Sequence, residues 1–246
     1  MKRTTLLSGR GLVKADAMKW RQLTDDVAVM SFPWRVLGIN FGRNVTLLRL
    51  GDGRVVIHST APFTKNDVEA IRRFGEPAWL VDASLLHDTF AKEGRLAFPD
   101  LPYLAPNGFG KVSGIPVQSL ADPPGDWKDE IDILKIDGHR MSEHLFLHRR
   151  SATLVVSDLF FSFPVETRGW PRFFVRQIMR LPRLFGVSAF FRFLTIQDRA
   201  AFERSMRALM RWNFDRLIVA HGDPIEKEAR PLVERALRDI EVLREM

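Results

Sequence analysis

A chain of 246 residues with 46% hydrophobic and 27% charged residues is long enough for a sizeable core and ordinary for a globular protein. The absence of cysteine excludes disulfide bonds and thiolate metal sites, so any bound metal must be held by His, Asp or Glu. Because no apolar stretch approaches the ~18 residues of a spanning helix and the basic start lacks a signal-peptide core, we expect a cytoplasmic protein, at most peripheral to a membrane.

The net charge of +7 is unevenly distributed along the chain. No acidic residue lies between Glu166 and Asp198. That window instead mixes arginines with aromatic residues: Arg168, Arg172, Arg176, Arg180, Arg183 and Arg192 alternate with Trp170, Phe173, Phe174, Phe185, Phe190, Phe191 and Phe193. The basic character of the protein is therefore local.

The first predicted elements are a hairpin and a helix. Residues 45–50 and 54–58 are apolar runs that flank a Gly-Asp-Gly turn, which is typical of a β-hairpin. Thr64 and Asp67 have the spacing of a capping box, so a helix is expected from there to about residue 74.

The rest of the chain alternates irregularly between strand and helix patterns. Strands are predicted at 78–81, 131–136, 145–148, 153–157 and 217–220, and helices at about 85–92, 170–181, 184–194, 198–212 and 226–245. This order predicts a layered α/β protein with two sheets between helices. We expect one domain over residues 1–246, with a helical insertion rich in arginine and aromatic residues at about 165–212.

Histidine and aspartate side chains follow several of the predicted strands. His87, His139 and His221 each come after an apolar run, and Asp158 ends another. Neutral imidazole and carboxylate are the ligands that zinc, iron or manganese take in proteins. Each of these residues alone is typical of a turn or a helix cap, but their combination at strand ends indicates a metal site.

Three longer stretches resemble the metallo-β-lactamase superfamily: WRVLGINFGRNVTLLRLGDGRVVIHSTAPFT, SEHLFLHRRSATLVVSDLFF and RWNFDRLIVAHGDPI. They look most like an uncharacterised branch of it, a domain-of-unknown-function family with no settled activity. The resemblance covers roughly residues 20–240. It implies a four-layer αββα sandwich that binds one or two metal ions at the sheet edges.

The superfamily's His-x-His-x-Asp-His motif matches residues 82–87 only in part. His87 stands in the last position, whereas Asp82, Ser84 and Leu86 replace the other ligands. A register shifted by one would bring in Asp88 instead.

The remaining ligand positions of the superfamily correspond to His139, Asp158 and His221. The resemblance thus implies one metal on His87, Asp158 and His221, and a reduced second set of Asp82, His139 and Asp158. Three protein ligands with an open position are typical of a catalytic zinc site, so one ion is expected rather than two.

Two functional hypotheses stay open at this point. The first is a metal-dependent hydrolase of unknown small-molecule substrate, with a metal-bound hydroxide as nucleophile and Asp158 and Glu143 as catalytic residues. Glu143 would serve as a further ligand or as a general base near His139, unless it is simply a strand residue paired with an arginine. The second is a catalytically inactive, metal-free binding domain, peripheral to the membrane or binding an anionic ligand.

Arg172, Arg176, Arg180 and Arg183 are spaced to form one stripe on a helix until Pro182 disturbs it. Such a stripe suits anionic lipid or an anionic substrate, but a surface helix with solvated arginines and packed aromatics has the same pattern. No nucleic-acid-binding motif accompanies it, so nucleic acid is not expected as a partner. The sequence does not set the oligomeric state.

Overall fold

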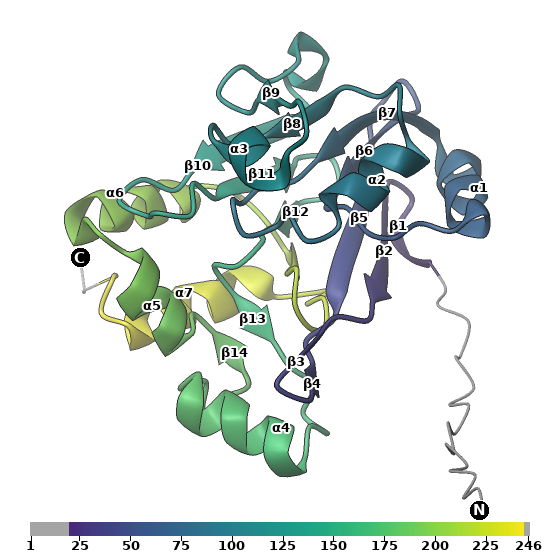
Figure 1. Cartoon of the computed structure of the whole chain (residues 1–246). Helices are drawn as coiled ribbons and strands as arrows, with labels where there is room; N and C mark the ends of the chain where they lie inside the picture. Colours follow the sequence, from purple (N-terminus) through teal and green to yellow (C-terminus); the bar gives the residue numbers. More distant parts are fainter. Residues whose placement is uncertain (1–19, 244–246) are drawn as a thin grey trace, which may run out of the picture.

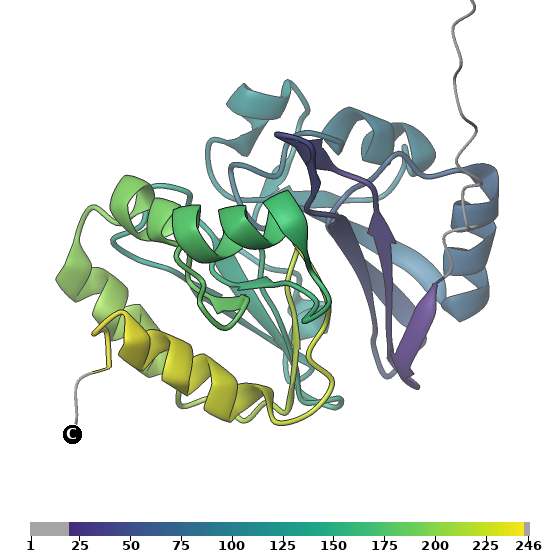
Figure 2. The same ribbon diagram turned by 90° about the horizontal axis from the view of Figure 1, so that it is seen from below.

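Two β-sheets lie face to face between helices in residues 20–243, the part of the chain that the computed structural model describes (Figure 1). Figure 2 shows this layering from below, with helices of the second half of the chain on one side, helices of the first half on the other, and the sheets between them. The predicted four-layer αββα sandwich is confirmed.

The first sheet has seven strands in the order β1-β2-β5-β6-β7-β8-β9. They are β1 Arg21–Thr24, β2 Val27–Phe32, β5 Arg43–Arg49, β6 Arg54–His58, β7 Glu76–Val81, β8 Tyr103–Ala105 and β9 Gln118–Ser119. The predicted hairpin is β5–β6, which pair antiparallel, and β7 follows in parallel after helix α1 (Lys65–Phe74). A small hairpin, β3 Arg35–Val36 and β4 Ile39–Asn40, projects between β2 and β5.

The second sheet has the order β10-β11-β12-β15. Its strands are β10 Ile131–Lys135, β11 His144–His148, β12 Thr153–Val155 and β15 Arg216–Ile218, the last pair being parallel. Two short strands, β13 Phe161–Ser162 and β14 Phe185–Gly186, pair with each other outside this sheet.

The central strands β5, β6, β11 and β12 are buried on both faces, which explains why they read as largely apolar runs. In β5, Leu48 points into the layer between the sheets, and its neighbour Leu47 packs under the helices. In β11, Phe146 lies between the sheets, while Leu145 and Leu147 face the other helices.

Helices α1 Lys65–Phe74, α2 Ala91–Ala97 and α3 Phe109–Ser113 cover the first sheet, and α5 Ala189–Thr195, α6 Arg199–Leu209 and α7 Ala229–Asp239 cover the second. A 3₁₀ turn, Gly125–Trp127, precedes β10. The capping box predicted for α1 is present, with the Thr64 hydroxyl accepting from the Asp67 amide and the Asp67 carboxylate accepting from the Thr64 amide.

The helix predicted at 85–92 is wrong. The chain makes turns there, because the His87 amide donates to the Ser84 carbonyl (3.1 Å), and α2 starts only at Ala91. This tight turn is what presents His87.

The continuous helix predicted at 170–181 is also wrong in its second half. Helix α4 covers only Gly169–Phe173 and passes into a π-helical turn, Phe174–Ile178. Arg180 then adopts a left-handed conformation (φ 55°), so the arginines from 172 to 183 do not form one helical stripe. The helix predicted at 184–194 begins only at Ala189, capped by the Ser188 hydroxyl, because the preceding residues form β14.

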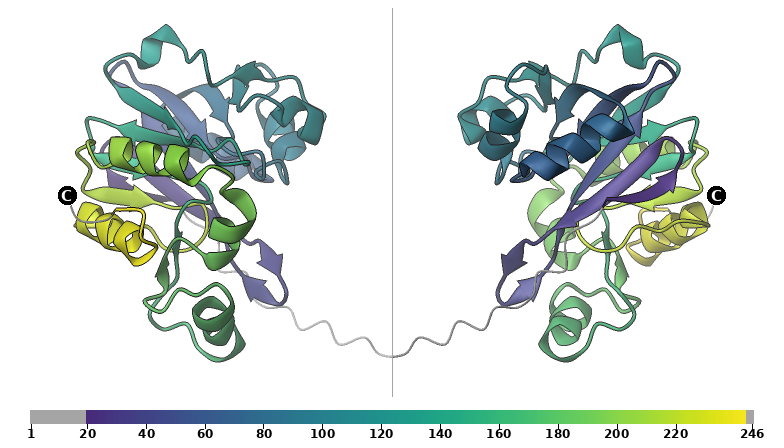
Figure 3. Two further views of the ribbon diagram at one scale, coloured as in Figure 1. Left: turned by 90° about the vertical axis from the view of Figure 1, so that its left-hand side faces the viewer. Right: turned by 90° about the vertical axis from the view of Figure 1, so that its right-hand side faces the viewer.

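Helix α4 and the β3–β4 hairpin protrude from the same end of the molecule, as the side views of Figure 3 show. Among the described residues, no helix combines the length and apolar character needed to cross a membrane.

Candidate metal centre

His87, Asp158 and His221 converge beyond the ends of strands β7, β12 and β15. The His87 Nε2 and His221 Nε2 atoms lie 3.4 and 3.6 Å from Asp158 Oδ1, and one donor atom of each residue lies within 4.8 Å of the others. Donors that share a tetrahedral zinc ion at about 2.0–2.1 Å are roughly 3.3 Å apart. The cluster therefore has the spacing of a metal site.

The His87 imidazole has no other partner. Its side chain is buried, and neither ring nitrogen makes a hydrogen bond to any residue in the range 20–243. Leaving a buried polar group unpaired costs about 1–3 kcal/mol. A metal ion at this position would satisfy the Nε2 lone pair. The three side chains therefore fit a bound metal ion.

The orientation of His221 is fixed from behind. Its Nδ1 lies 2.7 Å from the Gly42 carbonyl oxygen, so Nδ1–H donates there and the Nε2 lone pair faces Asp158. Trp34 and Phe161 stack on the His221 ring, with centroids 4.8 and 5.7 Å away. This is the arrangement of a metal-ligating histidine held by a backbone carbonyl.

The turn that carries His221 depends on Gly222 and Asn44. Gly222 has φ 107°, and a Cβ there would lie 1.6 Å from the Ser162 carbonyl oxygen. The Asn44 amide group donates to the carbonyls of Val219 and Gly222 (2.7 Å each). Sequence reasoning missed Asn44, and the only signal was a polar residue at the start of an apolar strand.

Asp158 is held by two buried side chains. Ser84 Oγ donates to Asp158 Oδ2 (3.0 Å), which leaves Oδ1 to the two imidazoles. Glu143 Oε1 accepts the backbone amides of Ser157, Asp158 and Leu159 at 2.8, 3.1 and 3.3 Å. Glu143 therefore fixes the loop, and within the described chain no arginine pairs with it.

The protonation states suit a metal. Burial, and then the Arg43 guanidinium, lower the pKa of His87 to about 4, so its imidazole is neutral at pH 7. Burial alone would raise the pKa of Asp158, but His87 and His221 hold it well below its usual value. Burial and the Asp158 carboxylate raise the pKa of Glu143 to about 8. Neutral imidazole and ionised carboxylate are the forms that bind metals.

Two other predicted ligands lie outside the three-residue cluster. His139 stacks on Phe191 (centroids 4.4 Å apart), and burial lowers its pKa to about 4. The oxygens of Asp82 are occupied by the Arg43 guanidinium (3.1 Å), the Thr60 amide and hydroxyl (3.2 and 2.7 Å) and the Tyr103 hydroxyl. Both oxygens of Asp82 are thus occupied by protein donors within a buried network.

The neighbours of His87 do not join the cluster either. Leu86 is half exposed, and Asp88 is not among the grouped donors. His148, a further histidine on a predicted strand, bonds Ser151 Oγ (2.8 Å) and the Arg49 carbonyl (3.2 Å), as a structural histidine does.

The four arginines predicted for anionic ligands or membrane have different surroundings. Arg172 donates to the carbonyls of Val165 and Thr167, and Arg183 pairs with Asp239. Arg176 and Arg180 are exposed.

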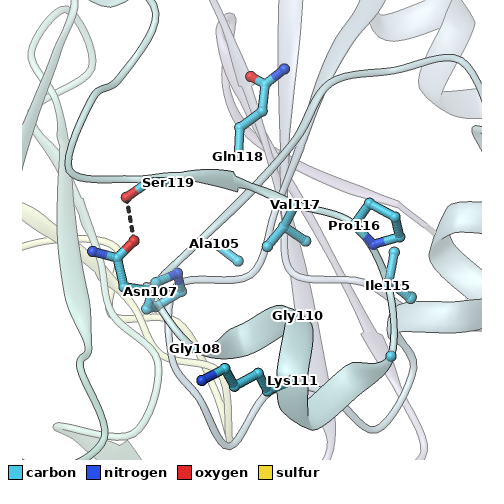
Figure 4. A pocket seen from close by; sticks show the side chains of 12 residues that line it. Ala105, Asn107, Gly108, Gly110, Lys111, Ile115, Pro116, Val117, Gln118 and Ser119 are labelled. Carbon is cyan, nitrogen blue, oxygen red and sulfur yellow. Dashed lines mark hydrogen bonds between the residues drawn. The ribbon is translucent and has the colours of Figure 1, made fainter.

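A separate hollow of about 560 Å³ lies between β8, α3 and β9 (Figure 4). Its wall includes Asn107, Lys111 and Gln118, and Ser119 Oγ donates to Asn107 Oδ1 (2.7 Å). None of the three clustered donors lines it, so it is distinct from the candidate metal centre.

The comparisons with known proteins identify the fold. No family model matches the chain, and no curated protein matches its sequence. Among solved structures, the DIM-1 metallo-β-lactamase is 15% identical with a TM-score of 0.61, over 91% of this chain and 98% of that one. The mono-zinc form of FIM-1 from Pseudomonas aeruginosa is 12% identical over 91% and 96%, also with a TM-score of 0.61. A metallo-β-lactamase from Erythrobacter litoralis is 12% identical over 92% and 99%, again at 0.61.

Proposed function

We propose that this chain, which has the metallo-β-lactamase fold, is a metal-dependent hydrolase with one metal ion held by His87, Asp158 and His221. The observation that carries the proposal is the buried His87 ring, which has no hydrogen-bond partner in the described structure and lies 3.4 Å from Asp158. Zinc suits this donor set best, and iron or manganese accepts the same ligands. A bound ion of this kind lowers the pKa of a coordinated water and so supplies a nucleophile near neutral pH.

The surrounding residues position the ligands. The Gly42 carbonyl fixes the tautomer of His221 by accepting from its Nδ1–H. The Ser84 hydroxyl donates to the second oxygen of Asp158, and the Glu143 carboxylate accepts backbone amides of the loop that carries Asp158. Glu143 Oε1 accepts three backbone amides, whereas its buried Oε2 has no hydrogen-bond partner among residues 20–243, and on the Oε1 contacts we assign Glu143 a positioning role. Partners of this kind orient ligands and raise metal affinity.

One ion is favoured over two. Ser84 and Leu86 stand where the resemblance expects ligands, and the oxygens of Asp82 are already taken by Arg43, Thr60 and Tyr103. Of the second predicted ligand set, only His139 has both ring nitrogens without a hydrogen-bond partner within residues 20–243.

A second candidate is a binding domain in which the metal has a structural role. It is favoured by the deep burial of the ligands, since His87, Asp158 and His221 are only 1%, 6% and 4% exposed. The two candidates predict the same metal binding but different chemistry.

Metal content and zinc titration test the centre itself. We expect about one ion per chain after purification without chelator, and His221→Ala and Asp158→Ala should each abolish tight binding. His144→Gln is the matched control, because this buried histidine bonds the Ser142 carbonyl outside the cluster. Retention of the metal by both ligand variants would mean that other residues hold it.

Assays with chromogenic ester, thioester, lactam and phosphodiester substrates separate the two candidates. The hydrolase predicts turnover that requires metal and is lost in His221→Ala. Tight metal binding that raises the melting temperature, without turnover of any of these classes, would favour the structural role.

A further inference from the structure

The exposed aromatic side chains of residues 20–243 gather in one part of the molecule. Trp170 and Phe173 on α4 are 52% and 53% exposed, and Phe190 and Phe193 on α5 are 54% and 67% exposed. All other aromatic residues in the described range are buried or half-buried. A concentration of exposed apolar side chains marks an interaction surface.

The β3–β4 hairpin continues this surface. The Trp170 indole donates to the Leu37 carbonyl (3.2 Å), and Leu37 at the tip of the hairpin is 67% exposed. On the other side, α5 is joined to the end of the π-helical turn by the Ala189 amide and the Met179 carbonyl (2.8 Å). Figure 2 looks onto this face, with α4 between the hairpin and α5. We call the exposed apolar side chains of these three elements, with the arginines of residues 168–192, the arginine–aromatic surface.

The charge of this surface has one sign. Arg168, Arg176 and Arg180 are exposed and make no ion pair with any described residue. The Arg192 guanidinium lies over the Phe193 ring, 4.7 Å from its centroid. Nearby, a hollow of about 360 Å³ is lined by Arg180, Arg183 and Arg192, with Asp239 as its acidic residue, and Asp239 pairs with Arg183. The surface is complementary to an anionic partner.

We propose that the arginine–aromatic surface docks onto an anionic lipid bilayer, with Trp170, Phe173 and Phe193 in the interfacial region and the arginines among the headgroups. Aromatic rings prefer this depth of a bilayer, and each basic residue near an anionic membrane adds electrostatic attraction. A second copy of the chain is a poorer partner, because a symmetric contact would place arginines against arginines.

The surface is also continuous with the wall of the metal centre. Ring contacts lead from His221 to Phe41 (6.4 Å between centroids), from Phe41 to Phe174 (6.3 Å), and from Phe174 to Trp170 (5.8 Å). Docking would therefore place the bilayer against the aromatic residues that enclose His221. The membrane proposal itself does not depend on whether a metal is bound.

Co-sedimentation of the full-length protein with vesicles tests the proposal. We expect binding to an equal mixture of phosphatidylcholine and phosphatidylglycerol, none to phosphatidylcholine alone, and weaker binding at ~1 M than at ~0.1 M salt. The pair Arg168→Glu and Arg176→Glu should lower partitioning at least about tenfold. The pair Phe173→Ser and Phe193→Ser should also lower it, by loss of apolar insertion.

Matched controls lie on the opposite helices. Arg72→Glu on α1 and Leu96→Ser on α2, where Leu96 is 79% exposed, should bind vesicles like the unmodified protein. Absence of binding to anionic vesicles at low salt would overturn the proposal, as would binding of either double variant at the level of the unmodified protein. A dimer in solution that Phe173→Ser dissociates, without vesicle binding, would instead assign the surface to a second copy.

Discussion

Two buried polar clusters lie side by side near the sheet edges, joined by Arg43, and they differ in how their hydrogen bonds are satisfied. In the network around Asp82, cation, amide and hydroxyl donors occupy both carboxylate oxygens. In the cluster of His87, Asp158 and His221, the imidazole Nε2 atoms face one carboxylate oxygen at distances too long for good hydrogen bonds. The comparison teaches that a buried carboxylate with both oxygens occupied by protein donors is structural, whereas converging lone pairs without such donors indicate a site for a cation.

The largest expected effect is on the network around Asp82. Asp82→Asn leaves Arg43 as a buried charge without its counter-ion, which should lower the free energy of unfolding by about 3–5 kcal/mol. Zinc affinity, measured by competition with a chromogenic chelator, should change by no more than a few-fold.

Asp158→Asn should show the reverse. Zinc affinity should fall by at least about a hundredfold, a loss of about 2.7 kcal/mol, while the metal-free protein should lose less unfolding free energy than in Asp82→Asn, because the amide oxygen can still accept from the Ser84 hydroxyl. Equal losses of affinity in the two variants would make Asp82 a ligand and remove the distinction between the clusters.

Gly222→Ala tests the turn that presents His221. Its Cβ would meet the Ser162 carbonyl, so the free energy of unfolding should fall by about 2–3 kcal/mol and zinc binding should weaken. The control is Gly53→Ala. Gly53 also has a positive φ (90°), but no atom lies within 4 Å of the Cβ that the substitution would add. Denaturant unfolding with and without zinc measures both, and equal effects would show that φ strain alone matters.

A buried histidine outside the cluster gives a pH-dependent effect. Burial lowers the pKa of His58 to about 3, whereas the unfolded chain takes up the proton near pH 6.5. Its neutral form therefore stabilises the fold above pH 6.5, and this contribution is lost as the pH falls toward the folded value. Between pH 7 and pH 5, unfolding free energy should fall by about 2 kcal/mol more in the unmodified protein than in His58→Leu. Identical pH profiles would contradict this.

The smallest expected effect is at His87, where a single substitution should abolish zinc binding but raise the stability of the metal-free protein. Replacing it with leucine removes an unpartnered buried imidazole, so the metal-free protein should gain about 1 kcal/mol of unfolding free energy. The same variant should no longer bind zinc. A destabilised metal-free protein would mean that His87 has a hydrogen-bonding role in the fold.

The sequence predicted the strands and helices of the layers from local signals, whereas the choice of His87, Asp158 and His221 as one ligand set came from the resemblance to the metallo-β-lactamase superfamily. Apolar runs ending in His or Asp, and the capping box at Thr64, need no knowledge of distant partners. The sequence could not predict that both oxygens of Asp82 are occupied by protein donors, since these donors, Arg43, Thr60 and Tyr103, come from separate strands and loops. The π-helical turn at Phe174–Ile178 was missed because its residues keep an ordinary helical pattern.

The central claim is most directly tested by an anomalous diffraction map recorded at the zinc absorption edge from crystals grown with zinc. The account predicts one peak, at about 2.0–2.2 Å from His87 Nε2, His221 Nε2 and a carboxylate oxygen of Asp158, with Asp82 still paired to Arg43. A peak ligated by Asp82 or His139 in place of these residues, or no peak at full zinc saturation, would contradict it.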